Sequence, residues 1–279
     1  ALTTGANNVA VGSAALSTED GNGNNVAVGV SALATLNAGA DAGNVAIGYQ
    51  ALTAETTGVD NVAVGANAGD AVTTGSDNTF VGDNAGGATT TGANNIAIGS
   101  AALLVNSTGA DNVAIGSLAL DANTTASNNT TVGSESLSTN TTGEQNTAMG
   151  KASMGANTTG SYNVAYGAYS LDANTTANNN VALGYNALTA NTTGASNTAL
   201  GKGSLLANTT GAENVAVGAA ALAANTTAGN NTAVGVESMD ANTTGTQNTA
   251  VGKSSMGANT TGNYNVSYGA YSLDANTTA

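Results

Sequence analysis

The sequence predicts an all-β fold, a parallel β-solenoid or β-roll of about sixteen stacked coils with 17 residues in each coil. Two observations carry this prediction: a five-residue motif that returns at a fixed step, and the same residue types at the same place in every copy. The motif is Asn-Val-Ala-Val-Gly in its commonest form. Its Asn stands at positions 8, 25, 44, 61, 78, 95, 112, 129, 146, 163, 180, 197, 214, 231, 248 and 265. The step is 17 residues except between Gly29 and Gly48, where it is 19.

The motif alternates in the way a strand does. We number the positions of each coil from its Asn, so that the Gly is position 5. Position 3 is Ala in thirteen of the sixteen coils, and Phe80, Thr131 and Ser267 are the departures. Positions 2 and 4, which flank it, are apolar or Thr, and we expect them to face the core. Position 9 is Leu or Met in all coils except at Gly69 and Gly86, which predicts a second short strand packed against the first.

The invariant Asn and Gly predict a ladder along the stack. The Gly fits a turn with positive φ, and the Thr-Thr-Gly that follows position 12 in most coils marks a second turn. Stacking places the Asn side chains one above another at the strand spacing, where their amides can pair. We therefore expect a structural ladder whose members include Asn61, Gly65, Asn112, Gly116, Asn214 and Gly218.

The whole chain, 1–279, belongs to this one array. Residues 133–177 return almost verbatim at 235–279, a shift of six coils. An α-helix is disfavoured by the β-branched residues, Gly and Asn at fixed places. Disorder is disfavoured because disordered tracts lack apolar residues in register.

Composition excludes several classes of function. There are seventeen Asp and Glu against three Lys and no Arg, so the net charge is −14, which disfavours binding to nucleic acid. Without His or Cys the chain has no Ser-His-Asp triad, no Cys-His pair and no zinc site, and we expect neither catalysis nor a cofactor. Asp60 and Asp77 share a place in neighbouring coils, but we interpret them as a solvated loop pair and predict no metal site.

The uniform Ala column suggests a contact with a second chain. A strand face that is turned to water would vary among polar residues, whereas Ala in nearly every coil indicates close packing against a flat partner. On this interpretation Ala63, Ala114 and Ala216 lie at an oligomer interface.

Tyrosines are the candidate ligand contacts. Tyr166 and Tyr268 occupy position 4 and are expected in the core. The possible contacts for a receptor or glycan are Tyr162, Tyr169, Tyr264 and Tyr271. The three lysines, Lys151, Lys202 and Lys253, each follow the coil Gly. Lys151 and Lys253 each have a carboxylate in the coil before, Glu135 and Glu237, and we expect exposed pairs of little energetic value. The Asn-Thr-Thr triplets match the N-glycosylation sequon, although turns are the simpler interpretation.

These residues resemble a known family. Asn-Ile-Ala-Ile-Gly at 95–99 and Asn-Val-Ala-Ile-Gly at 112–116 are similar to the head repeats of trimeric autotransporter adhesins. The longer unit that ends Ala-Leu-x-Ala-Asn-Thr-Thr-Gly also resembles repeats of bacterial surface and phage tail-fibre proteins. The resemblance covers the whole chain and implies a left-handed parallel β-roll with three chains wound about one axis. The 17-residue coil departs from the shorter repeat of the adhesin heads.

The expected function is that of a non-enzymatic structural rod in an extracellular fibre, as a bacterial surface adhesin or filament subunit at the cell surface. A phage tail-fibre shaft and an ice-binding β-solenoid are the alternatives. The expected partner is the chain itself, as a homotrimer, and membrane insertion is not expected. Because the chain opens at Leu2-Thr3-Thr4-Gly5 and stops at the equivalent turn, Asn276 to Ala279, head-to-tail filaments are a further expectation.

Overall fold

The structure is a computed structural model that describes residues 6–18, 23–39 and 41–278. The expected opening turn at Leu2–Gly5 lies outside these described residues. The chain divides into two units, Ala1–Thr142 and Gly143–Ala279. Each unit is a parallel β-solenoid with one three-residue strand in every coil, and the described residues contain no helix. The all-β solenoid and its 17-residue coil are thereby confirmed.

The strands of the first unit are β1 (Val9–Val11), β2 (Val26–Val28), β3 (Val45–Ile47), β4 (Val62–Val64), β5 (Thr79–Val81), β6 (Ile96–Ile98), β7 (Val113–Ile115) and β8 (Thr130–Val132). Those of the second unit are β9 (Thr147–Met149), β10 (Val164–Tyr166), β11 (Val181–Leu183), β12 (Thr198–Leu200), β13 (Val215–Val217), β14 (Thr232–Val234), β15 (Thr249–Val251) and β16 (Val266–Tyr268). We give each coil the number of its strand.

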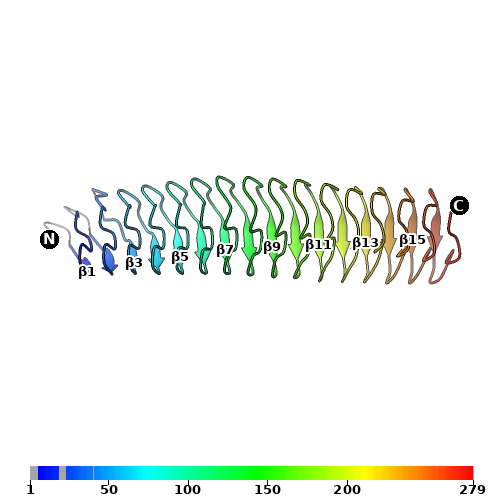
Figure 1. Cartoon of the computed structure of the whole chain (residues 1–279), viewed down its shortest axis with the longest axis horizontal. Helices are drawn as coiled ribbons and strands as arrows, with labels where there is room; N and C mark the ends of the chain where they lie inside the picture. Colours follow the sequence, from blue (N-terminus) through cyan, green and yellow to red (C-terminus); the bar gives the residue numbers. More distant parts are fainter. Residues whose placement is uncertain (1–5, 19–22, 40, 279) are drawn as a thin grey trace. The chain divides into compact units, whose positions relative to one another are not determined.

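Within each unit the strands lie side by side in chain order and in parallel, as Figure 1 shows. The register places each position of one coil beside the same position of the next. Ala97 pairs with Ala114 in the first unit, and Ala199 pairs with Ala216 in the second. Nearly all coils have the same length, so residues of the same type stack on one another along each unit.

The inward face of the strand is the Ala face, and the sequence-based assignment of the two faces is wrong. Ala63, Ala114 and Ala216 have no solvent-accessible surface in the single chain, so they are core residues and not an interface with a second chain. The flanking positions 2 and 4 face outward, as shown by Ile96 and Ile98, which are 37% and 38% exposed. The reason is the narrowness of the coil. Leu at position 9, such as Leu103 and Leu137, is itself fully buried, which leaves room on the strand for a small side chain such as Ala97 or Thr131.

The predicted second strand is also wrong. The segment that follows the coil Gly forms turns, because the residues at positions 7 and 9 have positive φ in every coil; Ala101 and Leu103 both have φ of 54°. The residue before each coil Asn has positive φ as well, as at Asp111 with 58°. Backbone N–H groups of this segment still bond between coils, as from Leu103 N to Ala119 O at 2.9 Å. The coil closes by turning and not by a second extended strand.

The residue types at these three positions follow from that backbone. The left-handed region is costly for side chains that branch at Cβ. Val, Ile and Thr are common elsewhere in the chain, yet none of them occupies position 7, position 9 or the position before the coil Asn in any coil. Position 9 is therefore Leu or Met because it must be apolar and unbranched at Cβ.

One pair of coils replaces the usual packing by another of similar volume. Phe80 takes the place of the inward Ala in coil 5 and is fully buried. Gly69 and Gly86, the two exceptions at position 9, lie against its ring: a Cβ added to them would come within 2.7 Å and 2.5 Å of ring carbons of Phe80. Phe80, Gly69 and Gly86 therefore depart from the repeat together. The large side chain on the strand fits because the two positions against its ring have no side chain.

Position 9 provides a test of the backbone argument. Leu103→Ile keeps the volume and polarity of the side chain but adds a branch at Cβ in the left-handed region, whereas Leu103→Met has no such branch. We expect Leu103→Ile to lower the free energy of unfolding by about 1–3 kcal/mol more than Leu103→Met. Urea denaturation followed by circular dichroism measures the difference. Equal values for the two variants would show that the left-handed backbone does not select the residue.

The Phe80 packing provides a second test. Phe80→Ala leaves a cavity and is expected to cost about 3–5 kcal/mol of stability. Adding Gly69→Leu and Gly86→Leu restores the arrangement of the other coils and is expected to recover most of that loss, because φ at Gly69 and Gly86 is 58° and 63°, close to the values at the native leucines. Gly86→Leu with Phe80 retained is the control and is expected to destabilise by overpacking. If the three effects were additive in urea denaturation, the proposed packing would be wrong.

Candidate functional site

Two ladders of buried Asn side chains occur in each unit, the first along all of its coils and the second from Asn106 onward. The first ladder is formed by position 1. Asn112 has no solvent-accessible surface, and its backbone N–H and its Nδ2 both donate to Oδ1 of Asn95 at 3.1 Å. In the second, at position 12, Nδ2 of Asn123 donates to Oδ1 of Asn106 at 2.8 Å. The ladders meet at one backbone carbonyl, since Ala126 O accepts from Nδ2 of Asn112 at 2.9 Å and of Asn123 at 3.0 Å.

The same arrangement occurs in the second unit. Asn214 donates from Nδ2 to Oδ1 of Asn197 at 3.1 Å and to Ala228 O at 2.9 Å, while Asn225 donates to that carbonyl at 3.0 Å. Sequence reasoning found the first ladder and missed the second. The signal was present, because position 12 is Asn in eleven successive coils, from Asn106 to Asn276.

The coil glycines stack with no space for a side chain. Gly65, Gly116 and Gly218 have φ of 145°, 137° and 133°, and a Cβ on any of them would lie within 2.4 Å of the carbonyl oxygen of the next coil's Gly. The Asn and Gly columns are therefore structural. They offer nothing to a ligand, since both are held against the neighbouring coil.

The Asn that would carry a glycan in the Asn-Thr-Thr sequons is buried. Their Asn is position 12, and residues such as Asn191 and Asn208 have no accessible surface. Nδ2 of Asn208 is engaged with Asn191 Oδ1 at 2.9 Å and with Gly211 O at 2.9 Å. A glycan on that nitrogen is incompatible with this fold, so the triplet serves as core and turn.

The two threonines of the triplet differ. The hydroxyl of the first donates to the carbonyl of the same residue in the next coil, as from Thr209 Oγ1 to Thr226 O at 3.1 Å. The second, as at Thr210 and Thr227, is exposed. One exposed Thr column at a turn does not favour the ice-binding alternative, for which we expect paired Thr columns on a strand face.

The outward face of the strands is an apolar surface on each unit. Positions 2 and 4 contain no charged residue in any coil, and only six of these positions are polar, all of them Thr. In the second unit Val164, Leu183 and Val215 are 40%, 46% and 36% exposed. Hydrophobic side chains arranged in rows on a flat sheet face are typical of a surface that contacts a partner.

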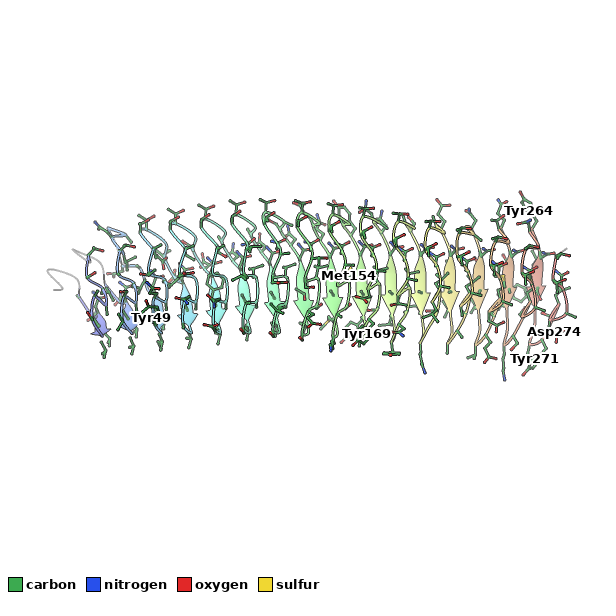
Figure 2. The ribbon with its side chains drawn as sticks, in the orientation of Figure 1. Tyr49, Met154, Tyr169, Tyr264, Tyr271 and Asp274 are labelled. Atoms are coloured by element: carbon green, nitrogen blue, oxygen red, sulfur yellow. The ribbon has the colours of Figure 1, made fainter. Side chains whose placement is uncertain are left out.

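The tyrosine candidates do not form one site. Figure 2 shows Tyr169 and Tyr271 at one edge of the second unit and Tyr264 at the opposite edge. Tyr162 has the same coil position as Tyr264, so the four predicted contacts divide between two edges. The expectation for position 4 is wrong, since Tyr166 and Tyr268 are 51% and 74% exposed and belong to the outward strand face.

Lys253 interacts with an aromatic ring. Its Nζ lies 5.6 Å from the centre of the Tyr271 ring, in the next coil. The hydrogen bond to Tyr271 and the negative charge of Glu237 both raise the pKa of Lys253, with the Tyr271 hydrogen bond as the larger cause. The predicted partner Glu237 contributes less to this shift than the tyrosine does.

The described residues form no cluster of three or more groups able to hold a metal ion, and no pocket is found among them. Asp60 and Asp77 donate their backbone N–H groups to Ala42 O and Val59 O of the preceding coils, as expected for ordinary turns. No helix in the described ranges is long and apolar enough to cross a lipid bilayer.

A carboxyl group that sequence reasoning missed lies in the core of the first unit. Glu55 occupies position 12 of coil 3, before the Asn column begins at Asn106, and has no accessible surface. Its Oε1 accepts a hydrogen bond of 2.6 Å from Asn61 Nδ2, while its Oε2 has no partner. Burial raises the pKa of Glu55 from 4.5 to about 8, although the Asn61 hydrogen bond opposes this. The group is enclosed, so it does not meet a substrate, but it makes stability depend on pH.

The sign of that dependence follows from the raised pKa. Between the unfolded value of 4.5 and the folded value of about 8, the folded chain keeps a proton that the unfolded chain has lost. Stability is therefore greatest below the unfolded pKa, falls as pH rises through this window, and levels off above it. Glu55→Gln removes the titration. We expect the stability of the native chain relative to Glu55→Gln to fall between pH 5 and pH 8, by roughly 4 kcal/mol. Urea denaturation at successive pH values measures it, and parallel profiles for the two proteins would contradict the assignment.

Comparison with known proteins gives no relative. No protein-family model, no curated protein and no solved structure matches the chain. The resemblance to the head repeats of trimeric autotransporter adhesins therefore stays a prediction that rests on the repeated motif.

Proposed function

We propose that the chain is a non-enzymatic structural segment of an extracellular fibre, as in a bacterial surface adhesin or filament, and that it assembles with copies of itself through the outward faces of its strands. The observation that carries this proposal is the uncharged, largely apolar outward face formed by positions 2 and 4 within each unit.

The hydrogen bonds of the core support a mechanical role in a fibre. Every coil contributes backbone and Asn side-chain hydrogen bonds to the coils beside it, as from Asn197 N to Asn180 Oδ1 at 2.9 Å and from Val181 N to Asn197 O at 2.8 Å. These bonds run along the stacking direction of the unit. Extending such a stack lengthens it without any change in the fold, which suits the repeated element of a fibre.

The outward strand face supports association with a second copy. The chain carries a net charge of −14, so surfaces with carboxylates repel one another when copies meet. Positions 2 and 4 are free of charge and present Val, Ile and Thr in flat rows. Two such faces exclude water from apolar area without burying any charge. The number of copies, three, follows from the resemblance to trimeric adhesin heads.

The assembly test places charge on this face. Ile96→Lys with Ile98→Lys puts two lysines on the outward face of β6, where both isoleucines are more than a third exposed in the single chain. Each buried unpaired charge costs several kcal/mol, so we expect association to weaken by about two orders of magnitude or more. Light scattering with size-exclusion chromatography gives the mass.

The matched control is Thr91→Lys with Thr108→Lys, which adds the same charge at exposed turn positions. We expect a trimeric mass for the parent and the control, and a monomeric mass for the strand-face variant. A monomeric parent at all concentrations, or the same mass for all three proteins, would exclude the outward strand face as the interface.

A further inference from the structure

Four side chains form a row along the second unit. Lys151, Tyr185 and Lys202 follow the coil Gly at position 6 of coils 9, 11 and 12, and Tyr169 stands at position 7 of coil 10. Cross-coil hydrogen bonds hold neighbours of the row together: Tyr169 N donates to Lys151 O at 3.0 Å, and Gly203 N, beside Lys202, donates to Tyr185 O at 3.0 Å. The order along the stack is Lys, Tyr, Tyr, Lys.

The two aromatic rings of the row are in contact, and one of them is largely open to solvent. The ring centres of Tyr169 and Tyr185 are 6.2 Å apart with an angle of 85° between the ring planes, an edge-to-face pair. Tyr185 is 50% exposed, and Tyr169 is half-buried beside it. Large aromatic area therefore remains at this edge beyond what the chain itself covers.

The charge of the row is opposite to that of the rest of the chain. The sequence of the first unit has eleven acidic residues and no basic one, while the second unit has six acidic residues and all three lysines. Two of those lysines stand at the ends of the row, three coils apart, which is about 14 Å at the spacing of parallel strands. A partner that extends along the stack meets a cation, two aromatic rings and a second cation.

We propose that this row is a binding surface for an acidic polysaccharide, a polymer of carboxylated sugars. The pyranose ring has an apolar C–H face that packs on an exposed tyrosine, and its carboxylate groups pair with the flanking lysines. No pocket is found along the described coils, so the surface suits an extended polymer better than a small molecule.

Other anionic polymers fit less well. A nucleic acid gains its affinity from many phosphate contacts, and two lysines neutralise too few phosphates on a chain of this net charge. An acidic peptide lacks the flat ring faces that would use both tyrosines. The edge that carries Tyr264 has no lysine at its coil position and takes no part in the proposal.

The test uses the full chain and immobilised polygalacturonate, with dextran as a neutral polymer and poly-glutamate as an acidic peptide. Two double variants remove the proposed contacts: Tyr169→Ala with Tyr185→Ala, and Lys151→Gln with Lys202→Gln. Tyr49→Ala is the matched control, because Tyr49 has the coil position and exposure of Tyr185 but lies in the unit without lysine. Tyr169→Phe with Tyr185→Phe keeps the rings and guards against loss of fold.

We expect the native chain to bind polygalacturonate at about 20 mM salt and to lose most of that binding at about 0.5 M salt. Each of the first two double variants is expected to bind roughly tenfold more weakly, while Tyr49→Ala and the double Phe variant bind like the native chain. The proposal is overturned by absence of binding to polygalacturonate, by equal binding to dextran or poly-glutamate, or by unchanged binding in the Tyr or Lys variants. This experiment measures ligand binding, whereas the assembly test measures mass. Polysaccharide binding can therefore be absent while the proposed assembly is present, and assembly can be absent while binding is present.

Discussion

Hydrogen bonding between successive coils through buried Asn amides is the interaction on which the rest of this structure depends. A coil of 17 residues with a single three-residue strand encloses backbone carbonyls that have no strand partner, and leaving them unpaired would cost about 1–3 kcal/mol each. The carbonyl of Ala126 shows the solution, since it accepts from Asn112 and from Asn123 while each of these amides also bonds to the Asn of the preceding coil. Because those partners belong to different coils, a coil is satisfied only when it is stacked.

The same narrowness explains the distribution of apolar residues. The interior accepts Ala from the strand and Leu from position 9, and the larger Phe80 enters only where position 9 is Gly on two neighbouring coils. Branched apolar residues are thereby left outside, on positions 2 and 4, where the strand geometry favours them. The chain thus has an exterior apolar strip beside a core whose Asn amides are hydrogen-bonded between coils. Glu55 is the exception within the described core, a fully buried carboxyl at position 12, where coils 6 to 16 hold the neutral amide of Asn.

Function is expected at the positions where the repeat varies. Positions 1 and 5 are Asn and Gly in every coil, and the two Gly at position 9 compensate for Phe80, so these positions are committed to packing between coils. Positions 6 and 7 lie outside the core and differ from coil to coil. Lys151, Tyr169, Tyr185 and Lys202 all occupy them, and their alignment into one row is a consequence of the in-register stacking. A solenoid of this kind displays a row of contacts without altering its core.

From the sequence alone it was possible to predict the repeat period, the place of the strand, the first Asn ladder and the stacked Gly. A constant step in an array places identical residues beside one another, and few folds allow that arrangement. The missing His and Cys likewise excluded whole classes of catalytic and zinc sites from the sequence alone. The inward side of the strand was not predictable, since alternation of Val and Ala establishes only that they face opposite ways and both are apolar. The tertiary structure decided it by turning the chain through left-handed residues at positions 7 and 9 and burying Leu at position 9, which leaves the strand space for small side chains such as Ala114 and Thr131. It also separated Tyr264 from Tyr271, because the coil turns between them and places the two rings on opposite edges.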